Sequence, residues 1–422
     1  MSPEPQTPSS ERLAAWSALL EPSSGRLLAR IAEIEDKVRP GPKELSALRE
    51  LAEPAVVSAA LDLAQARHKG ADKFSRVESM ILDLAGVEQA SGEDIAQWKA
   101  QRFAGQDRVW DLCCGIGGDA MALAEVVGSL VAVDSDPLAC LMARHNLGLS
   151  ATAAQSAEVR CLGVEDLLSA GELEDAVLHI DPARRSEGSH SGRGGRSWRF
   201  EDGRPGPEVL ARLVDISRGA AIKLGPGVEL DELPGNAEAE IEVIGSRGGL
   251  KQVVLWTGAL TERAGQRRAT RVEKGQTFAA APRGRLRHRE AVSTYLYIPD
   301  PALERAGLVA ARLAELDTEA WNLHPGLGYL HGEQPLDDPW FQCFEVATVL
   351  PWREKKIKAW LEQNEGGDVE VRTRGGAVVV EKARRELRGG GPKRYVIFGL
   401  RLGKRIQAFV TRVLDPGNET PG

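Results

Sequence analysis

The sequence predicts an α/β fold with a mostly parallel, seven-strand sheet, a helical region before it and a small α/β domain after it. Three observations predict this arrangement. Residues 11–104 space their apolar side chains three and four positions apart. Residues 108–224 alternate short apolar runs with helical patterns. Two β-rich runs then follow, joined by the turn residues "RGG". The expected division is a helical region at 1–104, a sheet domain at 105–260, a linker or insert at 261–348 and a last domain at 349–415.

Each part of this fold corresponds to a stretch of sequence. The expected parallel strands are "RVWDLCC", "SLVAVDS", "AEVRCLG", "DAVLHID" and "GAAIKLG". The expected helices between them are "GGDAMALAEVV", "PLACLMARHNLG", "EDLLSAG" and "PEVLARLVDIS". The hairpin of "AEIEVIGS" and "LKQVVLWTG" would close the sheet with an antiparallel last strand. The last domain would end in a second hairpin, "KRYVIFGLRLGKRIQAFVTRVL".

Length, charge and cysteine content narrow the class of protein. A chain of 422 residues is long enough for two or three domains. No apolar run reaches the roughly 20 residues that span a bilayer, and the first residues lack a secretory pattern. The five cysteines form no C-x-x-C pair, so we expect no disulfide framework and no metal site, and a cytoplasmic location fits. The net charge of −7 argues against a protein that is basic all over.

The segment "DLCCGIGGDA" is the first candidate for a binding site, because it lies at a strand-to-helix turn. Glycines there let the backbone approach a ligand closely, and a helix start offers unpaired N–H groups. The spacing Gly115-x-Gly117-x-x-Ala120 also fits the dinucleotide fingerprint. The choice is therefore between a nicotinamide or flavin nucleotide and S-adenosylmethionine.

Two features favour the methyl donor. Asp111 stands four residues before Gly115, where a carboxylate can meet the ammonium group of methionine but would repel a pyrophosphate. The closing hairpin is typical of class I methyltransferases. Asp134, placed to accept the ribose hydroxyls, discriminates little, because NAD enzymes share it. Glycines and acids can also simply make turns, but here acids recur at the strand ends, where open α/β sheets bind ligands. These acids are Asp111, Asp134, Asp166 and Asp181.

At this point the sequence resembles a known family. "DLCCGIGGDA" resembles motif I of class I S-adenosylmethionine-dependent methyltransferases. Together with "DPARR", "AIKLGPG" and "VEVRTRGGAVVVEKARRELRGGGPKRYVIFGLRLGKR", the chain resembles bacterial methyltransferases with a C-terminal THUMP-like domain, over about 70–410. The resemblance implies a Rossmann-like catalytic domain, S-adenosylmethionine as methyl donor and an RNA substrate. Cys113 and Cys114 depart from the usual Gly or Ala of motif I, but these small side chains still fit.

The resemblance also implies a role for the acids and glycines in these motifs. Asp111 would face the methionine amino group, and Asp119 would be a further cofactor contact. Gly115 and Gly117 would lie under the methionine and ribose, and Asp134 would hold the ribose. Asp166 would approach the adenine amino group.

The motif "DPARR", residues 181–185, is the expected catalytic segment. Methyltransferases that act on exocyclic amino nitrogens carry Asp or Asn, Pro, Pro and an aromatic residue here. Asp181 and Pro182 remain, whereas Ala183 and Arg184 replace the second proline and the ring. An arginine plane can stack on a base or clamp a phosphate. We expect Asp181, Pro182 and Arg184 to be catalytic, with Asp181 orienting the acceptor and accepting a proton. Alternatively, Arg184 and Arg185 pair with nearby acids.

Substrate contacts are expected from three places. The expected residues are Arg185, Trp198, Lys223, Arg384, Arg385, Lys393 and Arg394. The Gly- and Arg-rich loop at about 183–205 suits a single-stranded nucleic acid, or is an ordinary insertion. Lys223 either faces the site or caps its own helix. The tail at 382–405 has nine basic residues and one acid, which indicates a phosphate-binding patch or a solvated face. The stretch "GVEQASGED" either covers the cofactor or only packs on the sheet.

The function predicted from these features is S-adenosylmethionine-dependent methylation of a base in RNA, in tRNA or rRNA. Two alternatives stay open. One is a small-molecule or protein methyltransferase whose basic tail is incidental. The other is a non-catalytic RNA-binding protein with a degenerate methyltransferase fold.

Overall fold

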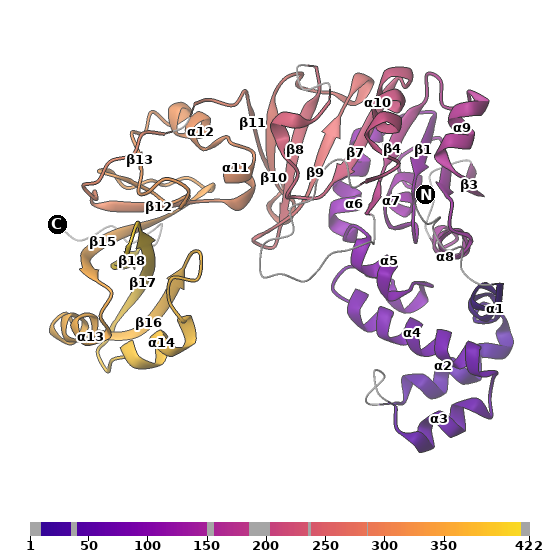
Figure 1. The fold of residues 1–422 in the computed structure, drawn as a ribbon, viewed down its shortest axis with the longest axis horizontal. Helices are drawn as coiled ribbons and strands as arrows, with labels where there is room; N and C mark the ends of the chain where they lie inside the picture. Colours follow the sequence, from indigo (N-terminus) through magenta and orange to yellow (C-terminus); the bar gives the residue numbers. More distant parts are fainter. Residues whose placement is uncertain are drawn as a thin grey trace. The chain divides into compact units, whose positions relative to one another are not determined.

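The computed structural model describes residues 10–34, 40–149, 156–184, 203–234, 238–284 and 286–414. The chain divides into two compact units (Figure 1). The first comprises Met1–Gln266 and Thr270–Thr277, and the second comprises Arg267–Ala269 and Phe278–Gly422. We describe each unit by itself, and the four-part division drawn from the sequence stays a prediction.

A nine-strand sheet has the order β11-β10-β8-β9-β7-β4-β1-β2-β3. Seven of its strands lie wholly within the first unit, and the residues of β10 and β11 divide between the two units. Its strands are β1 (Arg108–Leu112), β2 (Ser129–Asp134), β3 (Ser156–Cys161), β4 (Val177–Ile180), β7 (Gly219–Leu224), β8 (Glu240–Ser246), β9 (Gly249–Trp256), β10 (Arg267–Arg271) and β11 (Gln276–Ala280). The strands from β3 to β7 in this order run parallel, and β9 is antiparallel to both of its neighbours. The seven predicted strands are therefore present. β10 and β11 extend the sheet, although the sequence placed their residues in a linker.

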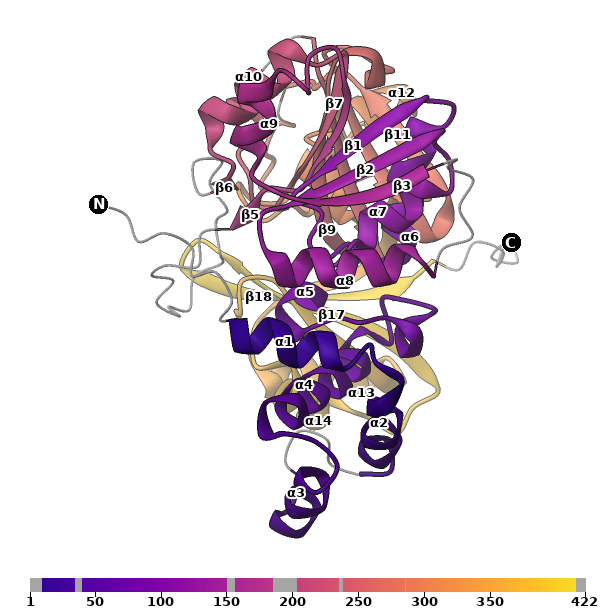
Figure 2. The same ribbon diagram turned by 90° about the vertical axis from the view of Figure 1, so that its right-hand side faces the viewer.

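The order of the strands determines where the helices lie. The chain runs from β1 through β2 to β3 and then returns to β4 on the other side of β1. Right-handed crossovers therefore place the first two connecting helices on one face and the next two on the other (Figure 2). These helices are α7 (Gly118–Ala124) and α8 (Pro137–Leu147), then α9 (Val164–Ala170) and α10 (Pro207–Ile216). The reversal between β1 and β4 is the position at which open α/β sheets bind ligands.

The N-terminal helices share a hydrophobic core with the sheet domain. They are α1 (Ser10–Ala18), α2 (Gly25–Ala32), α3 (Pro42–Arg49), α4 (Pro54–Gly70), α5 (Leu84–Gln89) and α6 (Glu93–Ala100). The buried Trp16 and Leu63 belong to one core with Met142 of α8. The Asn146 side chain is fully buried. Its Oδ1 accepts from the Ile81 N–H, and its Nδ2 donates to the carbonyls of Ile81 and Ile116. One polar side chain thus joins the helical region to the loop after β1.

A second link between the helical region and the sheet is a buried charge cluster on β8. Arg102 donates from Nη1 to Oε2 of the fully buried Glu240 at 3.0 Å and stacks 4.2 Å from the centroid of the Trp256 ring. Glu240 also accepts from the backbone N–H groups of Glu262 and Arg263. Its neighbour Glu242 accepts from Trp98, Trp256 and Thr270. We call Arg102, Glu240 and Glu242 the Arg102 cluster.

The second unit is built on a seven-strand sheet in the order β13-β14-β12-β15-β18-β17-β16. Its strands are β12 (Tyr295–Pro299), β13 (Trp321–Asn322), β14 (Leu330–Gly332), β15 (Phe341–Pro351), β16 (Gly366–Thr373), β17 (Lys393–Leu402) and β18 (Arg405–Val413). Its helices are α11 (Pro301–Arg305), α12 (Val309–Glu315), α13 (Glu354–Gln363) and α14 (Val380–Leu387). The predicted hairpin is present as β17 and β18, and α13 and α14 share a core with β16 and β17. β15 runs across the boundary that the sequence predicts after residue 348.

The helices in the described ranges are all too short or too polar to cross a membrane.

Candidate functional site

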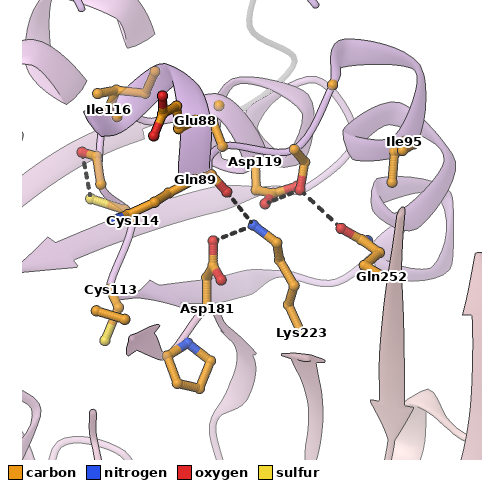
Figure 3. Close-up of a pocket in the computed structure, with 18 of the residues that line it drawn as sticks. Glu88, Gln89, Ile95, Cys113, Cys114, Ile116, Asp119, Asp181, Lys223 and Gln252 are labelled. Atoms are coloured by element: carbon orange, nitrogen blue, oxygen red, sulfur yellow. Dashed lines mark hydrogen bonds and ion pairs between the residues drawn. The ribbon is translucent and has the colours of Figure 1, made fainter. Parts of the chain in front are cut away.

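A cavity of about 480 Å³ opens at the carboxyl ends of β1, β2, β4 and β7 in the first unit (Figure 3). Its walls come from the loop after β1, the residues after β4, the end of β7, the start of β9 and the segment 86–92 before α6. Four carboxylates and three ammonium groups line it among the described residues: Glu88, Asp119, Asp134 and Asp181, and Lys73, Lys223 and Lys251. The cavity therefore lies at the sheet reversal where a ligand site is expected.

The loop after β1 is shaped by two glycines. Gly117 has a φ of 83°, and a Cβ there would lie 3.2 Å from the Cα of Ala143 in α8, so the turn and its close packing both require glycine. Gly115 also has a positive φ, of 54°, and lines the cavity. A Cβ on Gly115 would meet no atom within 4 Å, so the space beside it is open to a ligand.

Asp134, at the end of β2, lies beside this loop. Its Oδ2 accepts from the N–H of Gly115 and its Oδ1 from the N–H of Asp136, both at 2.9 Å. Burial raises the pKa of Asp134, although these two N–H groups oppose the shift. Each carboxylate oxygen has a second lone pair, so the side chain can still accept bonds from ribose hydroxyls. The glycine loop and Asp134 therefore fit the nucleoside part of S-adenosylmethionine.

Asp181 and Lys223 form an ion pair in the wall of the cavity. Lys223 Nζ donates to Asp181 Oδ2 at 2.5 Å and to the carbonyl of Gln89 at 3.1 Å. Burial lowers the pKa of Lys223, but Asp181, Asp119 and Asp111 outweigh it, so the pKa is raised above its usual value. The sequence left open whether Lys223 faces the site or caps its own helix. In the structure, Lys223 faces the cavity (Figure 3).

Behind the cavity lies a buried chain of polar side chains from α6, α7, β1 and β4. His179 donates from Nδ1 to Oδ1 of Asp111 at 2.6 Å, and its Nε2 lies 3.2 Å from Lys99 Nζ. Lys99 Nζ also lies 2.7 Å from Oδ1 of Asp119. Burial raises the pKa of Asp111 and lowers that of Lys99, whereas Lys99 overcomes burial and holds the pKa of Asp119 well below its usual value. Asp111 is fully buried and is absent from the described lining, so it lies behind the wall.

Ser91 and Gln252 connect these buried polar side chains to the wall of the cavity. Ser91 Oγ bonds Asp119 Oδ2 at 2.9 Å and lies 3.3 Å from Gln252 Oε1. Gln252 is only 3% exposed, lines the cavity, and its Nε2 has no hydrogen-bond partner among the described residues. A buried donor without a partner is costly, and a ligand in the cavity can satisfy it.

The segment before α6 forms part of the cavity wall. A Cβ on Gly86 would lie 2.3 Å from Cγ2 of Ile116, so α5 approaches the loop after β1 as closely as glycine allows. Lys73 Nζ donates to the carbonyls of Val87 at 2.6 Å and Ala90 at 3.0 Å, which fixes this segment. Burial lowers the pKa of Lys73, and the nearby Lys223 and Lys251 lower it further. The stretch "GVEQASGED" thus does more than pack on the sheet.

The structure brings half of the twelve predicted first-unit residues together at the cavity. Those that line the cavity are Gly115, Asp119, Asp134, Asp181, Pro182 and Lys223. Asp166 lies apart: it is exposed, and its Oδ2 accepts from the N–H of Gly163 at 3.2 Å, capping α9. The backbone of Arg184, in the short strand β5 (Ala183–Arg184), pairs with β6 (Gly203–Arg204), but its side chain is not described. Arg185 and Trp198 lie outside the described residues.

The predicted basic residues of the second unit differ in their partners. Lys393 Nζ lies 2.5 Å from Glu365, and Arg394 lies 3.5 Å from Glu370 and 3.8 Å from Asp368. Arg384 and Arg385, exposed on α14, pair with no carboxylate among the described residues, and Arg385 bonds only the carbonyl of Glu381. The basic tail therefore contains both neutralised and unneutralised charges.

The sequence did not point to four residues in or behind the cavity wall: Lys73, Lys99, His179 and Gln252. Two of them left a signal. His179 interrupts the apolar run "VLHID", and Lys99 follows apolar positions of a helix that faces the sheet. A polar residue in such a position needs a buried partner. Lys73 follows the charged Asp72 and Gln252 follows the charged Lys251, so neither interrupts an apolar run and neither left a signal.

Comparison with known proteins identifies relatives of the chain. A family model described as THUMP domain-like matches residues 341–412. Two proteins from two strains of Mycobacterium tuberculosis, each described as an uncharacterized S-adenosylmethionine-dependent methyltransferase, are 33% identical over 343 residues. The match covers 79% of this chain and 88% of each relative. A crystal structure from Porphyromonas gingivalis, described provisionally as a methyltransferase, matches 96% of this chain and 99% of its own with a TM-score of 0.69 and 17% identity. This structural likeness confirms the fold.

Proposed function

Because the chain belongs to the S-adenosylmethionine-dependent methyltransferases, we propose that it transfers the methyl group to a base of RNA, in tRNA or rRNA. The observation that carries the proposal is the Asp181–Lys223 pair, which faces the same cavity as the glycine loop and Asp134. The pair offers polar groups to an acceptor beside the place where the donor fits. The THUMP domain-like match supports RNA as the carrier of that acceptor.

The donor side of the cavity is assigned to Gly115 and Asp134, with Asp134 holding the ribose, and Gly117 shapes the turn that places this loop. S-adenosylmethionine supplies an electrophilic methyl group when it is bound there. The charged lining groups sum to −1, four carboxylates against three ammonium groups, which complements a cationic donor. Asp119 faces its ammonium group in this proposal, and Asp111 acts indirectly by holding His179. The adenine contact of Asp166 stays a prediction from the sequence.

The acceptor side is assigned to Asp181, Pro182 and Lys223. Asp181 Oδ2 is held by Lys223, whereas Oδ1 has no hydrogen-bond partner among the described residues. A free carboxylate oxygen at the cavity can orient an acceptor N–H and take up its proton. Arg184, Arg185 and Trp198 stay predicted contacts to the RNA.

The second unit supplies backbone contacts in this proposal. Arg384 and Arg385 carry charges that no described carboxylate neutralises, so they can bind RNA phosphates. Lys393 and Arg394 already have carboxylate partners and would contribute less. We place the reaction in the cytoplasm, where the five free cysteines would stay reduced.

The test is to incubate the purified protein with methyl-labelled S-adenosylmethionine and total RNA from cells that lack the gene. We expect label in one RNA species and little in RNA from cells that carry the gene, which is already modified. Label that enters only metabolites or protein would contradict the proposal. Donor binding is measured separately by calorimetry, so that an inactive preparation is recognised.

A further inference from the structure

We propose that the methyl acceptor is a lactam nitrogen, the ring N–H beside a carbonyl in guanine or uracil, with Asp181 taking the proton and Lys223 binding the carbonyl oxygen. This inference rests on the proposed function and names the chemical group on which the site acts. Four observations carry it: three concern described residues of the cavity, and one concerns the sequence of "DPARR".

The first observation is the pattern of free hydrogen-bonding groups on the pair. A lysine ammonium group has three N–H donors, and Lys223 uses two of them, on Asp181 and on the Gln89 carbonyl. One donor is left beside the free Oδ1 of Asp181. The pair thus presents an acceptor next to a charged donor. A lactam presents the complementary pair, an N–H next to a C=O.

The second observation is the charge of Lys223. Lys223 is only 11% exposed at its side chain, so its charge is weakly screened inside the wall. When a lactam loses its N–H proton, negative charge moves to the adjacent carbonyl oxygen, and an ammonium group there stabilises it. A neutral exocyclic amine gains positive charge as it accepts a methyl group, and the same ammonium group would oppose that change.

The third observation is the departure of "DPARR" from the motif of the exocyclic-amine enzymes. Ala183 stands in place of the second proline and Arg184 in place of the aromatic ring. In addition, Lys223 already donates to Asp181 Oδ2, which leaves that oxygen one lone pair and places an ammonium donor beside the carboxylate. The site therefore offers less acceptor capacity to an NH2 group and an added donor to a carbonyl.

The fourth observation is the unpaired Nε2 of Gln252. It is a second donor in the wall of the same cavity and has no partner among the described residues. Uracil N3–H is flanked by two carbonyls, whereas guanine N1–H is flanked by one. Gln252 can serve the second carbonyl of uracil, and the experiment separates the two bases.

The reaction balances without any further reagent. The N–H proton passes to Asp181 Oδ1, and the electron pair left on the lactam forms the new N–CH3 bond. The S–CH3 bond of S-adenosylmethionine breaks with its pair staying on sulfur, which leaves a neutral thioether. Asp181 then returns its proton to water.

The first test identifies the modified nucleoside. RNA labelled by the enzyme is digested to nucleosides and separated with mass detection. We expect the label in 1-methylguanosine or 3-methyluridine, and these two products distinguish the bases. Label in N6-methyladenosine, N4-methylcytidine or N2-methylguanosine would overturn the lactam assignment and leave the proposed function standing. Absence of label from every RNA would overturn the proposed function, and this inference with it.

The second test measures binding without any methyl donor. Equilibrium dialysis compares the four ribonucleoside 5′-monophosphates with wild-type protein, with Lys223→Met and with Lys43→Met, an exposed lysine on α3 that serves as the matched control. We expect guanosine or uridine monophosphate to bind at least about tenfold more tightly than adenosine and cytidine monophosphate, a difference of roughly 1.4 kcal/mol in binding free energy. Lys223→Met should remove this preference and Lys43→Met should keep it. No preference in the wild-type protein would overturn the inference.

Discussion

Two regions of the first unit bury charged side chains, and they differ in how those charges are satisfied. In the Arg102 cluster, Arg102, backbone N–H groups and neutral donors surround Glu240 and Glu242, and no side-chain atom of the two carboxylates is left without a partner. Gln252 Nε2 in the cavity wall and Asp111 Oδ2 behind it are buried without hydrogen-bond partners among the described residues. Both regions therefore bury charge. Of the two, only the cavity region also has buried polar atoms that lack a hydrogen-bond partner in the described part of the chain.

This difference separates a structural from a functional arrangement of charges. The Arg102 cluster fastens the helical region to β8, so its loss should change stability. The cavity pair has free groups and space before it, so its loss should change chemistry. The same rule applies in the second unit, where Lys393 and Arg394 pair with carboxylates and Arg384 and Arg385 pair with none among the described residues.

The largest expected effect is on the stability of the Arg102 cluster. Arg102→Leu removes a guanidinium group that pairs with the fully buried Glu240 and lies 3.7 Å from Glu242. Removing one partner of a buried ion pair costs about 3–5 kcal/mol, which urea unfolding measures. The double variant Arg102→Leu with Glu240→Gln should recover part of this loss. An unchanged unfolding midpoint would show that the cluster is dispensable.

The next effect concerns the rate of methyl transfer. Lys223→Met should slow the single-turnover reaction about 10²- to 10³-fold, the usual loss when one group that stabilises developing charge is removed. Lys223→Arg should restore part of the rate because it keeps the charge. Donor affinity should change no more than a few-fold. An equal rate in Lys223→Met would place this lysine among structural residues.

The pH dependence of this variant sharpens the prediction. Because the pKa of Lys223 is raised above 10.5, its charge is lost only when the pH rises through that higher value, so the wild-type rate should be nearly flat from pH 7 to 9. Without the ammonium group, transfer should depend on prior ionisation of the acceptor, and the rate of Lys223→Met should rise with pH in this window. A flat profile for both proteins would contradict the charge argument.

A smaller effect is expected on donor binding. Asp134→Ala removes a carboxylate assigned to the ribose hydroxyls, and charge-assisted hydrogen bonds contribute about 1.5–3 kcal/mol each. Affinity for S-adenosylmethionine by calorimetry should fall roughly 10- to 100-fold. Asp166→Ala is the matched comparison: its carboxylate caps α9 at Gly163. A larger loss of affinity in Asp166→Ala would support its predicted adenine contact.

The smallest effect is expected on RNA affinity. Arg384→Gln with Arg385→Gln should weaken binding and lower the slope of log affinity against log salt by about 1.4, the value for two contacts to a single strand. Lys393→Gln with Arg394→Gln removes the same charge from residues that already have carboxylate partners. This second pair should change the slope less. The reverse order would contradict the rule that paired charges contribute little.

The sequence predicted the sheet well because its central strands are buried on both faces and read as apolar runs. β4 is buried at all four residues. The strand β11 lies at the sheet edge and β10 lies next to it. In β10, "RRATR" combines partly buried arginines with a buried Ala and Thr, so no apolar run marks it. In the second unit the hairpin of β17 and β18 was predicted, whereas β13 and β14, of two and three residues, are too short to give a strand pattern.

The sequence predicted the site residues that stand at the end of a single strand. It did not predict the contacts that depend on how two strands pair. Asp134 and Asp181 follow apolar strands, and both line the cavity. Asp111 was expected to face the cofactor, but β1 pairs with β4 in a register that sets Asp111 beside His179. That register depends on the strand order, which one sequence does not reveal. Lys99 likewise reaches Asp119 and His179 only through the packing of α6 on α7.

The most direct measurement of the central claim compares methyl transfer and donor binding on Asp181→Asn. This substitution keeps the shape of the side chain and removes the group that takes the proton. We predict that transfer to RNA falls about 10²- to 10⁴-fold while affinity for S-adenosylmethionine stays within a few-fold of wild type. An unchanged transfer rate, or a loss of donor binding equal to the loss of transfer, would contradict the assignment of this cavity wall to the acceptor.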